Sequence, residues 1–382
     1  DPDSRKSNGP GTLKAEASLL SLLDGLKGLG EFDCEWLVLA DAANRVSIPA
    51  IGRQYLRRLW QDGDFAEVVR RTDSLDPKSR ESNSEALAFR AISLIRLNKP
   101  DEALAIAAVL EHREGDYRAG AWAHAIPLYA KMVATGWTAT SDVADDWKGV
   151  AKACPSEPFF FYCYGESLAG IGQDDAALQA WRDCFKYPVA LSWYYPRVRI
   201  VEILVRSGRA VEAAEAADET LRYAPTRALA NVVWLEAHAA RLQTGAPGGY
   251  SPAQLAVLCD EAMRQFAQKS QEQAAVDLRE RLIVPHVLFL AMANQKEDAI
   301  AAAKEAINAD PPVKPVTLQR LAAVSAKEKL GVEDLAMRRV EALAGETTSV
   351  KFVRAIGLFR AGKRDDGAKL MRSAAEAAPK DW

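Results

Sequence analysis

Apolar residues recur three and four positions apart along most of the chain, which predicts amphipathic helices. The stretch 159–188 shows the unit: an apolar segment, a turn at Gly172, and a second apolar-periodic segment that closes on Pro188. A proline does not continue a helix, so Pro188 marks the end of the second segment. The sequence therefore predicts two helices joined by a short turn.

This two-helix pattern returns along the chain. The turn positions 63 and 98, 172 and 208, and 331 and 362 lie 35, 36 and 31 residues apart, which is a repeat of roughly 34. The predicted turn residues are Gly63, Asn98, Gly172, Gly208, Asn294, Gly331 and Gly362. One hairpin of this kind cannot bury its apolar face alone, so we expect neighbouring hairpins to stack.

The copy around Gly172 has large, small and aromatic residues at fixed offsets from its turn. They are Phe161, Tyr164, Gly165 and Leu168 before it, and Ala177, Trp181 and Cys184 after it. This arrangement resembles the tetratricopeptide repeat, and the resemblance covers about residues 48–382 with degenerate copies. It implies an all-α, right-handed superhelical solenoid of stacked antiparallel helix hairpins, with the first helices on the inner wall. In this register Phe161 and Tyr164 face the second helix of their own repeat.

The pattern also gives a domain division. We expect a flexible leader at 1–11, an N-terminal helical capping segment at 12–46, and one continuous solenoid of about nine degenerate helix pairs at 47–382. Two repeats have lengthened turns, and the second turn ends at Ser251, an N-cap residue that forms a capping box with Gln254. The polar start without methionine indicates that a signal peptide, a membrane anchor or an artificial boundary preceded residue 1. The compartment stays open: cytoplasmic, or extracytoplasmic if a signal or anchor came first.

The composition and charge of the chain limit the kinds of partner and site that can be expected. A net charge of −3 over 382 residues gives no global field for nucleic acid or anionic lipid, and no apolar stretch is long enough to span a bilayer. The five cysteines lie at irregular spacings without a CxxC pair, and the four histidines are scattered. No nucleophile–base constellation is recognisable. We therefore predict no catalytic, cofactor or metal site, and no enzymatic activity.

The inner-wall offsets supply the candidate binding residues. Glutamates recur there at 166, 202 and 236, which are 36 and 34 residues apart. Stacked first helices would set them about 10 Å apart in a row, and such a row beside tyrosines suits an extended peptide that carries Lys or Arg. The alternatives are aromatic packing and an ion pair between Glu202 and Arg206 within one helix. The predicted partner-binding residues are Phe159, Tyr162, Glu166, Tyr195, Arg199, Glu202, Arg206 and Glu236.

These features predict a non-catalytic adaptor that binds a protein or peptide segment, with basic residues, in its concave groove. The alternative is a structural scaffold of an envelope or secretion assembly that docks through its convex face or loops. An open, polar groove would favour the adaptor, and a groove filled by the chain itself would favour the scaffold. No nucleic acid is expected, and a membrane is expected only through a missing N-terminal anchor. A basic cluster near the end is interpreted as a solvated face, with nucleic-acid or phospholipid contact as its alternative: Lys351, Arg354, Arg360, Lys363, Arg364, Lys369 and Arg372.

Overall fold

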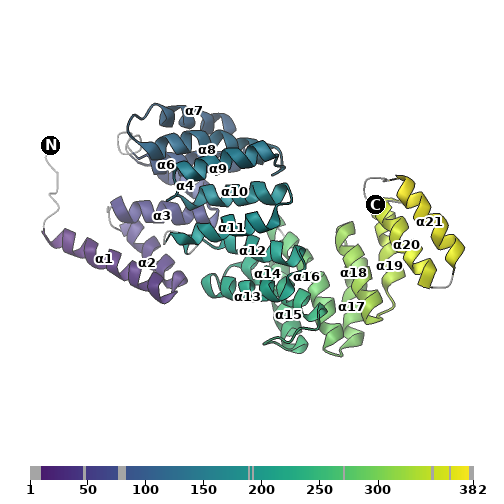
Figure 1. Cartoon of the computed structure of the whole chain (residues 1–382). Coiled ribbons are helices and arrows are strands. Elements are labelled where there is room, and N and C mark those ends of the chain that lie inside the picture. Colours follow the sequence, from purple (N-terminus) through teal and green to yellow (C-terminus); the bar gives the residue numbers. More distant parts are fainter. Residues whose placement is uncertain are drawn as a thin grey trace. The chain divides into compact units, whose positions relative to one another are not determined.

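The computed structural model describes residues 10–45, 49–75, 83–187, 190–191, 193–269, 272–345, 348–360 and 363–377. Every regular element in these residues is a helix (Figure 1). The chain comprises two compact units, residues 1–230 and residues 231–382. The predicted all-α fold of antiparallel hairpins is confirmed, whereas most of the predicted leader lies outside the described residues.

Unit 1 consists of hairpins whose helices pack in chain order, as α9, α10, α11 and α12 do in Figure 1. In each pair from α3 onward we call the earlier helix the first helix and the later one the second helix. Its helices are α1 (Pro10–Leu29), α2 (Phe32–Arg45), α3 (Pro49–Asp62), α4 (Phe65–Asp73), α6 (Ser84–Arg96), α7 (Pro100–Glu111), α8 (Tyr117–Ala134), α9 (Ser141–Ala153), α10 (Pro158–Gly170), α11 (Asp174–Asp183), α12 (Tyr194–Arg206) and α13 (Ala210–Tyr223), with a short 3-10 turn, η1 (Cys184–Lys186).

Unit 2 continues the same hairpin arrangement, and its first helix begins just before the unit boundary. Its helices are α14 (Ala228–Gln243), α15 (Pro252–Gln268), α16 (Gln273–Met292), α17 (Lys296–Ile307), α18 (Pro315–Glu328), α19 (Glu333–Ala344), α20 (Thr348–Arg360) and α21 (Arg364–Ala377). Among the described helices, none is both long and apolar enough to cross a membrane.

The predicted turn residues have the backbone conformation that the tight turns require. Gly63, Gly172 and Gly208 have φ angles of 83°, 77° and 73°, and Asn98 and Asn294 have 60° and 64°. A left-handed residue ends one helix and redirects the chain into the next, and glycine and asparagine tolerate that conformation best. The register of the repeat is therefore confirmed at these positions. Gly362 lies outside the described residues.

The start of α15 follows the predicted capping box. The Ser251 hydroxyl accepts a hydrogen bond from the Gln254 amide at 3.3 Å, and the Gln254 side chain accepts one from the Ser251 amide at 2.9 Å. Both bonds satisfy amide groups that a helix start leaves without a partner. This local prediction is confirmed.

The first helices of unit 1, together with Trp147 of the second helix α9, contribute a set of aromatic side chains that we call the aromatic core. Trp60 near the end of α3 stacks on Phe89 of α6 at 4.7 Å between ring centroids, and it meets Phe159 of α10 edge-on at 5.0 Å. Aromatic pairs of this geometry add to the free energy gained by burial. The members are all buried: Trp60, Phe89, Trp122, Tyr129, Trp147, Phe159, Phe160 and Trp193. We call the side on which they meet the inner face of unit 1.

Polar contacts fix α3 against the start of later first helices. Arg57 donates to Glu85 at the start of α6, and also to Glu157, the N-cap residue of α10, at 2.9 Å. Asp62 at the end of α3 accepts from Arg227 at 2.7 Å. Burial alone would lower the pKa of Arg57, but Glu157 and Glu85 outweigh that effect and raise it. The inner face of unit 1 is therefore occupied by the chain's own N-terminal part.

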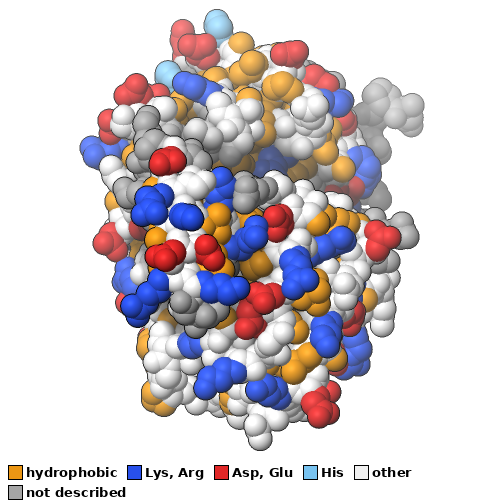
Figure 2. Space-filling model, turned by 90° about the vertical axis from the view of Figure 1, so that its right-hand side faces the viewer, with side chains coloured by type: hydrophobic (Ala, Val, Ile, Leu, Met, Phe, Trp, Pro, Cys, Tyr) orange, Lys and Arg blue, Asp and Glu red, His pale blue; other side chains and the backbone are white. Residues whose placement is uncertain are grey.

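The surface drawn in Figure 2 mixes Lys and Arg with Asp and Glu rather than presenting one sign of charge. In the C-terminal basic cluster, Lys351 donates to the Ser373 hydroxyl at 3.0 Å and Arg354 pairs with Glu341 at 3.2 Å. The side chain of Arg360 lies outside those described. Local pairing of this kind agrees with the interpretation of the cluster as a solvated face.

Candidate functional site

Helix α10 explains the unusual aromatic stretch at 159–164, because its side chains point in three directions. Phe159 and Phe160 enter the aromatic core and are buried. Tyr162 lies toward α12, where its ring centroid is 5.0 Å from that of Trp193. Phe161 and Tyr164 line a pocket against α9. A helix that is apolar on all sides is buried on most of them, and α10 packs against both α9 and α11.

Gly165 lets the second helix approach α10 closely. A Cβ atom at this position would lie 2.4 Å from the indole nitrogen of Trp181, which is fully buried on α11. The same indole N–H donates to the Tyr162 carbonyl oxygen at 3.2 Å. The small residue and the tryptophan, both read from the repeat pattern, therefore form one contact that sets the spacing of α10 and α11.

An arginine connects two of the predicted glutamates. Arg199 of α12 donates to Glu166 of α10 at 2.7 Å and to Glu202 of its own helix at 2.6 Å. We call this trio the arginine bridge. Burial raises the pKa of the Glu166 carboxyl, although Arg199 opposes the shift. The two carboxylates are therefore partly neutralised within the chain by Arg199.

The other predicted binding residues differ in how far a partner could reach them. Phe159 is only 2% exposed, so its ring belongs to the aromatic core. Tyr195 is half-buried, and its hydroxyl lies near Gly63. The side chain of Arg206 is 55% exposed and pairs with Asp174 at 2.6 Å. Glu236 lies in unit 2, where it accepts from Arg281 of α16 at 2.9 Å.

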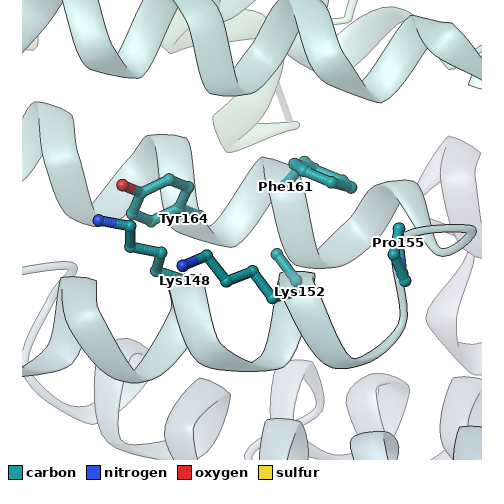
Figure 3. A pocket seen from close by; sticks show the side chains of 6 residues that line it. Lys148, Lys152, Pro155, Phe161 and Tyr164 are labelled. Carbon is teal, nitrogen blue, oxygen red and sulfur yellow. The ribbon is translucent and has the colours of Figure 1, made fainter.

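A pocket lies between α9 and α10. Phe161 is about 200° around the helix from the core residue Phe159, whereas Tyr164 lies one turn after the core residue Phe160, so the pocket borders the aromatic core. The pocket has a volume of about 350 Å³, and Figure 3 shows lysines from α9 facing aromatic rings from α10 across it. Its lining, which we call the α9–α10 pocket, is Lys148, Ala151, Lys152, Pro155, Phe161 and Tyr164.

The charges of this pocket are uncompensated within the described part of the chain. Lys148 and Lys152 are exposed and lie four residues apart on α9, where no described acidic side chain pairs with either. Like charges at this spacing repel each other and weaken the helix slightly. Ala151 is buried beneath them, and Phe161 and Tyr164 are half-buried. The pocket therefore combines an apolar floor with a positively charged rim.

The repeat register predicted that Phe161 and Tyr164 face the second helix of their own pair, but in the structure their rings border α9 of the preceding pair. The apolar periodicity of the sequence therefore does not predict the pocket. Lys148 and Lys152, at positions i and i+4, were its available sequence signal.

The buried thiols have little nucleophilic character. Burial raises the pKa of Cys154, and it raises the pKa of Cys163 and Cys184 well above the usual thiol value. A thiol with a raised pKa carries little thiolate at neutral pH. Among the described residues, no group of three or more His, Cys, Asp or Glu side chains is arranged to hold a metal ion.

Solved structures similar to this chain are helical-repeat proteins of low sequence identity. Human IFIT1, in a dimer with m7Gppp-AAAA, is 14% identical, with 94% of this chain and 89% of that chain covered and a TM-score of 0.40. Cut9, in the APC/C hetero-tetramer Cut9-Hcn1, is 13% identical, with 93% and 72% covered and a TM-score of 0.46. Yeast Tom70 is 11% identical, with 96% and 92% covered and a TM-score of 0.38.

These likenesses concern the fold alone. No family model matches the chain, and no curated protein matches it. The left-handed turn residues and the Gly165–Trp181 contact are features of this chain itself. The fold is thus a tetratricopeptide-repeat-like array of helix hairpins, as the resemblance in the sequence implied.

Proposed function

We propose that the chain is a non-catalytic protein-interaction module, and that its partner docks on unit 1 at the α9–α10 pocket. One observation carries the choice of surface: the aromatic core occupies the inner face, whereas the α9–α10 pocket is an open apolar hollow with exposed lysines at its rim. A groove filled by the chain's own helices leaves the outer side as the surface for a guest. In unit 1 this favours docking through the convex face over binding in a concave groove.

The absence of catalysis is supported by the state of the reactive groups. Burial raises the pKa of the Cys163 and Cys184 thiols, and it lowers the pKa of His286, which disfavours its charged form. A catalytic nucleophile or base instead needs a pKa near the operating pH, and it needs a partner within hydrogen-bond distance.

A protein partner agrees better with the charge of the chain than a nucleic acid does. The net charge is −3, and Lys and Arg on the surface in Figure 2 are interspersed with acidic residues. Affinity for nucleic acid depends on many Lys or Arg contacts to phosphates, which release bound counterions. The two lysines of the α9–α10 pocket are too few for that mode of binding but enough to orient a peptide.

The predicted inner-wall residues give a second candidate surface. Arg199 and Arg206 have side-chain exposures of 34% and 55%, and Glu202 between them is 25% exposed. Tyr162, Glu166 and Tyr195 would lie behind this surface and hold it in place. A partner segment that replaced the internal pairs of these arginines would bind here, at the cost of breaking the arginine bridge.

Site-specific photo-crosslinking in a native extract distinguishes the two surfaces. A photoreactive amino acid is placed at position 152 in the α9–α10 pocket or at position 206 beside the arginine bridge, in the full chain. We expect a discrete protein adduct from position 152 and none from position 206. An adduct from position 206 alone would move the docking surface to the inner-wall residues, and no adduct from either position would contradict both assignments.

A further inference from the structure

We propose that the α9–α10 pocket binds an acidic segment of the partner, with one hydrophobic side chain in the pocket and carboxylates on the rim. This inference rests on the proposed function and adds the chemistry of the ligand. It reverses the sign expected from the sequence, which pointed to a basic peptide on a row of glutamates.

The charge of the rim calls for an anionic ligand. Two other exposed lysines of unit 1 have acidic partners, since Lys99 pairs with Glu102 at 3.0 Å and Lys186 pairs with Asp183 at 2.9 Å, whereas the exposed Lys131 of α8 has none among the described residues. Lys148 and Lys152 have no such partner among the described residues, although Asp145 and Asp146 lie on the same helix. Two like charges one turn apart are stabilised when a carboxylate binds between them.

The floor of the pocket calls for an apolar group. Ala151, Pro155 and the rings of Phe161 and Tyr164 supply most of its lining. Long lysine stems pack along apolar surface while the ammonium groups stay in water, so a guest side chain can contact both stem and ring. The edge of the Tyr164 ring carries the one hydroxyl of the lining.

The size of the pocket restricts the guest. A volume of about 350 Å³ is at the lower end for small-molecule sites, so it accommodates a single large aliphatic or aromatic side chain. Because the pocket lies between two helices of adjacent pairs, the rest of the ligand must run across their exposed surface (Figure 3). A peptide with carboxylates on both sides of a leucine or phenylalanine meets these conditions.

Fluorescence anisotropy with defined peptides tests this chemistry on the full chain. The probe is a fluorescein-labelled heptapeptide of sequence Glu-Leu-Glu-Phe-Glu-Leu-Glu, and the comparison peptide has lysine in place of every glutamate. We expect the acidic peptide to bind at least tenfold more tightly than the basic one. Its affinity should fall several-fold between 50 and 300 mM salt, because these exposed charges are screened.

Charge-reversal variants locate the binding site. The double variant Lys148→Glu, Lys152→Glu should weaken binding of the acidic peptide about tenfold or more. Lys304→Glu is the matched control, since Lys304 is exposed in the last turn of α17 as Lys152 is in the last turn of α9; it should change affinity less than twofold. Phe161→Ala tests the apolar floor and should also weaken binding. Circular dichroism establishes that each variant is folded.

The outcomes separate this inference from the proposed function. Equal or tighter binding of the basic peptide, or unchanged binding by the lysine double variant, would overturn the acidic-ligand inference. If the photo-crosslinked adduct at position 152 persists in that case, the docking surface stands and only its chemistry is wrong. If the acidic peptide binds through Lys148 and Lys152 but no adduct forms there, the ligand chemistry stands and the proposed docking of a native partner fails.

Discussion

The contact between Gly165 and Trp181 makes a prediction that the structure quantifies. Replacing Gly165 with alanine would place a methyl carbon 2.4 Å from the indole nitrogen and 2.6 Å from the neighbouring ring carbon of Trp181. Real side chains do not approach this closely, so α11 or the indole ring must move. Trp181 is fully buried and donates to the Tyr162 carbonyl oxygen, so it has no free space to move into.

Three terms decide the size of the effect. Forcing an extra carbon into a packed core costs about 1–3 kcal/mol. Loss of the indole hydrogen bond costs about 1 kcal/mol, and alanine recovers about 1 kcal/mol over glycine within a helix. The last two terms cancel, so we expect Gly165→Ala to lower the free energy of unfolding by about 1–3 kcal/mol.

Urea denaturation followed by far-UV circular dichroism measures this change. The matched control is Gly149→Ala in α9, where a Cβ atom would meet nothing within 4 Å. That variant should be neutral or more stable by about 0.5–1 kcal/mol, since only the helix preference changes. If both variants shift the unfolding midpoint alike, close packing of α10 on α11 does not determine the stability of this pair.

Three further predictions concern buried charge and thiols. Arg57→Met should destabilise the chain by about 3 kcal/mol in urea denaturation, because it leaves a buried carboxylate unpaired. Arg70→Met, which breaks an exposed pair, should leave the unfolding midpoint nearly unchanged. Since the pKa of Glu166 is raised in the folded state, the folded protein holds that proton to a higher pH than the unfolded chain does. The carboxyl's contribution to stability is therefore greatest at low pH and falls as the pH rises above about 4.3; the stability of Glu166→Gln relative to the parent should rise over the same window, and a difference independent of pH would contradict the shift. A thiol reagent should label Cys34 quickly in the folded chain and the four buried cysteines only upon unfolding, as mass spectrometry of the adducts would show.

The periodic part of the fold was predictable because it depends on local chemistry. Gly63, Asn98 and Gly172 were recognisable as turns, since few residue types accept a left-handed backbone. Gly165 and Trp181 stood at fixed offsets within one repeat, although their contact appears only in the structure. The turn residues and the small and aromatic positions recur in each helix pair, so a single sequence contains several copies of the same pattern.

The candidate site was less predictable because its contacts cross the repeat register. Arg57 reaches Glu157, which is 100 residues away, and no periodicity links the two positions. Arg199 bridges Glu166 and Glu202, whereas the helical spacing had suggested a pair between Glu202 and Arg206. Charge partners on adjacent helices depend on rotamers and helix rotation, which the apolar pattern does not specify.

The contacts of Arg57 also bear on how the chain is made. A helical array with contacts only between neighbours can fold from its N-terminus as it emerges from the ribosome. Here α3 meets its partner Glu157 only after a further 100 residues have been synthesised. During synthesis Trp60 and Arg57 therefore lack their contacts with α10 until that helix has been made. In this interval α3 is exposed to chaperones. For the same reason the finished unit 1 should open as one cooperative block rather than fray from its ends.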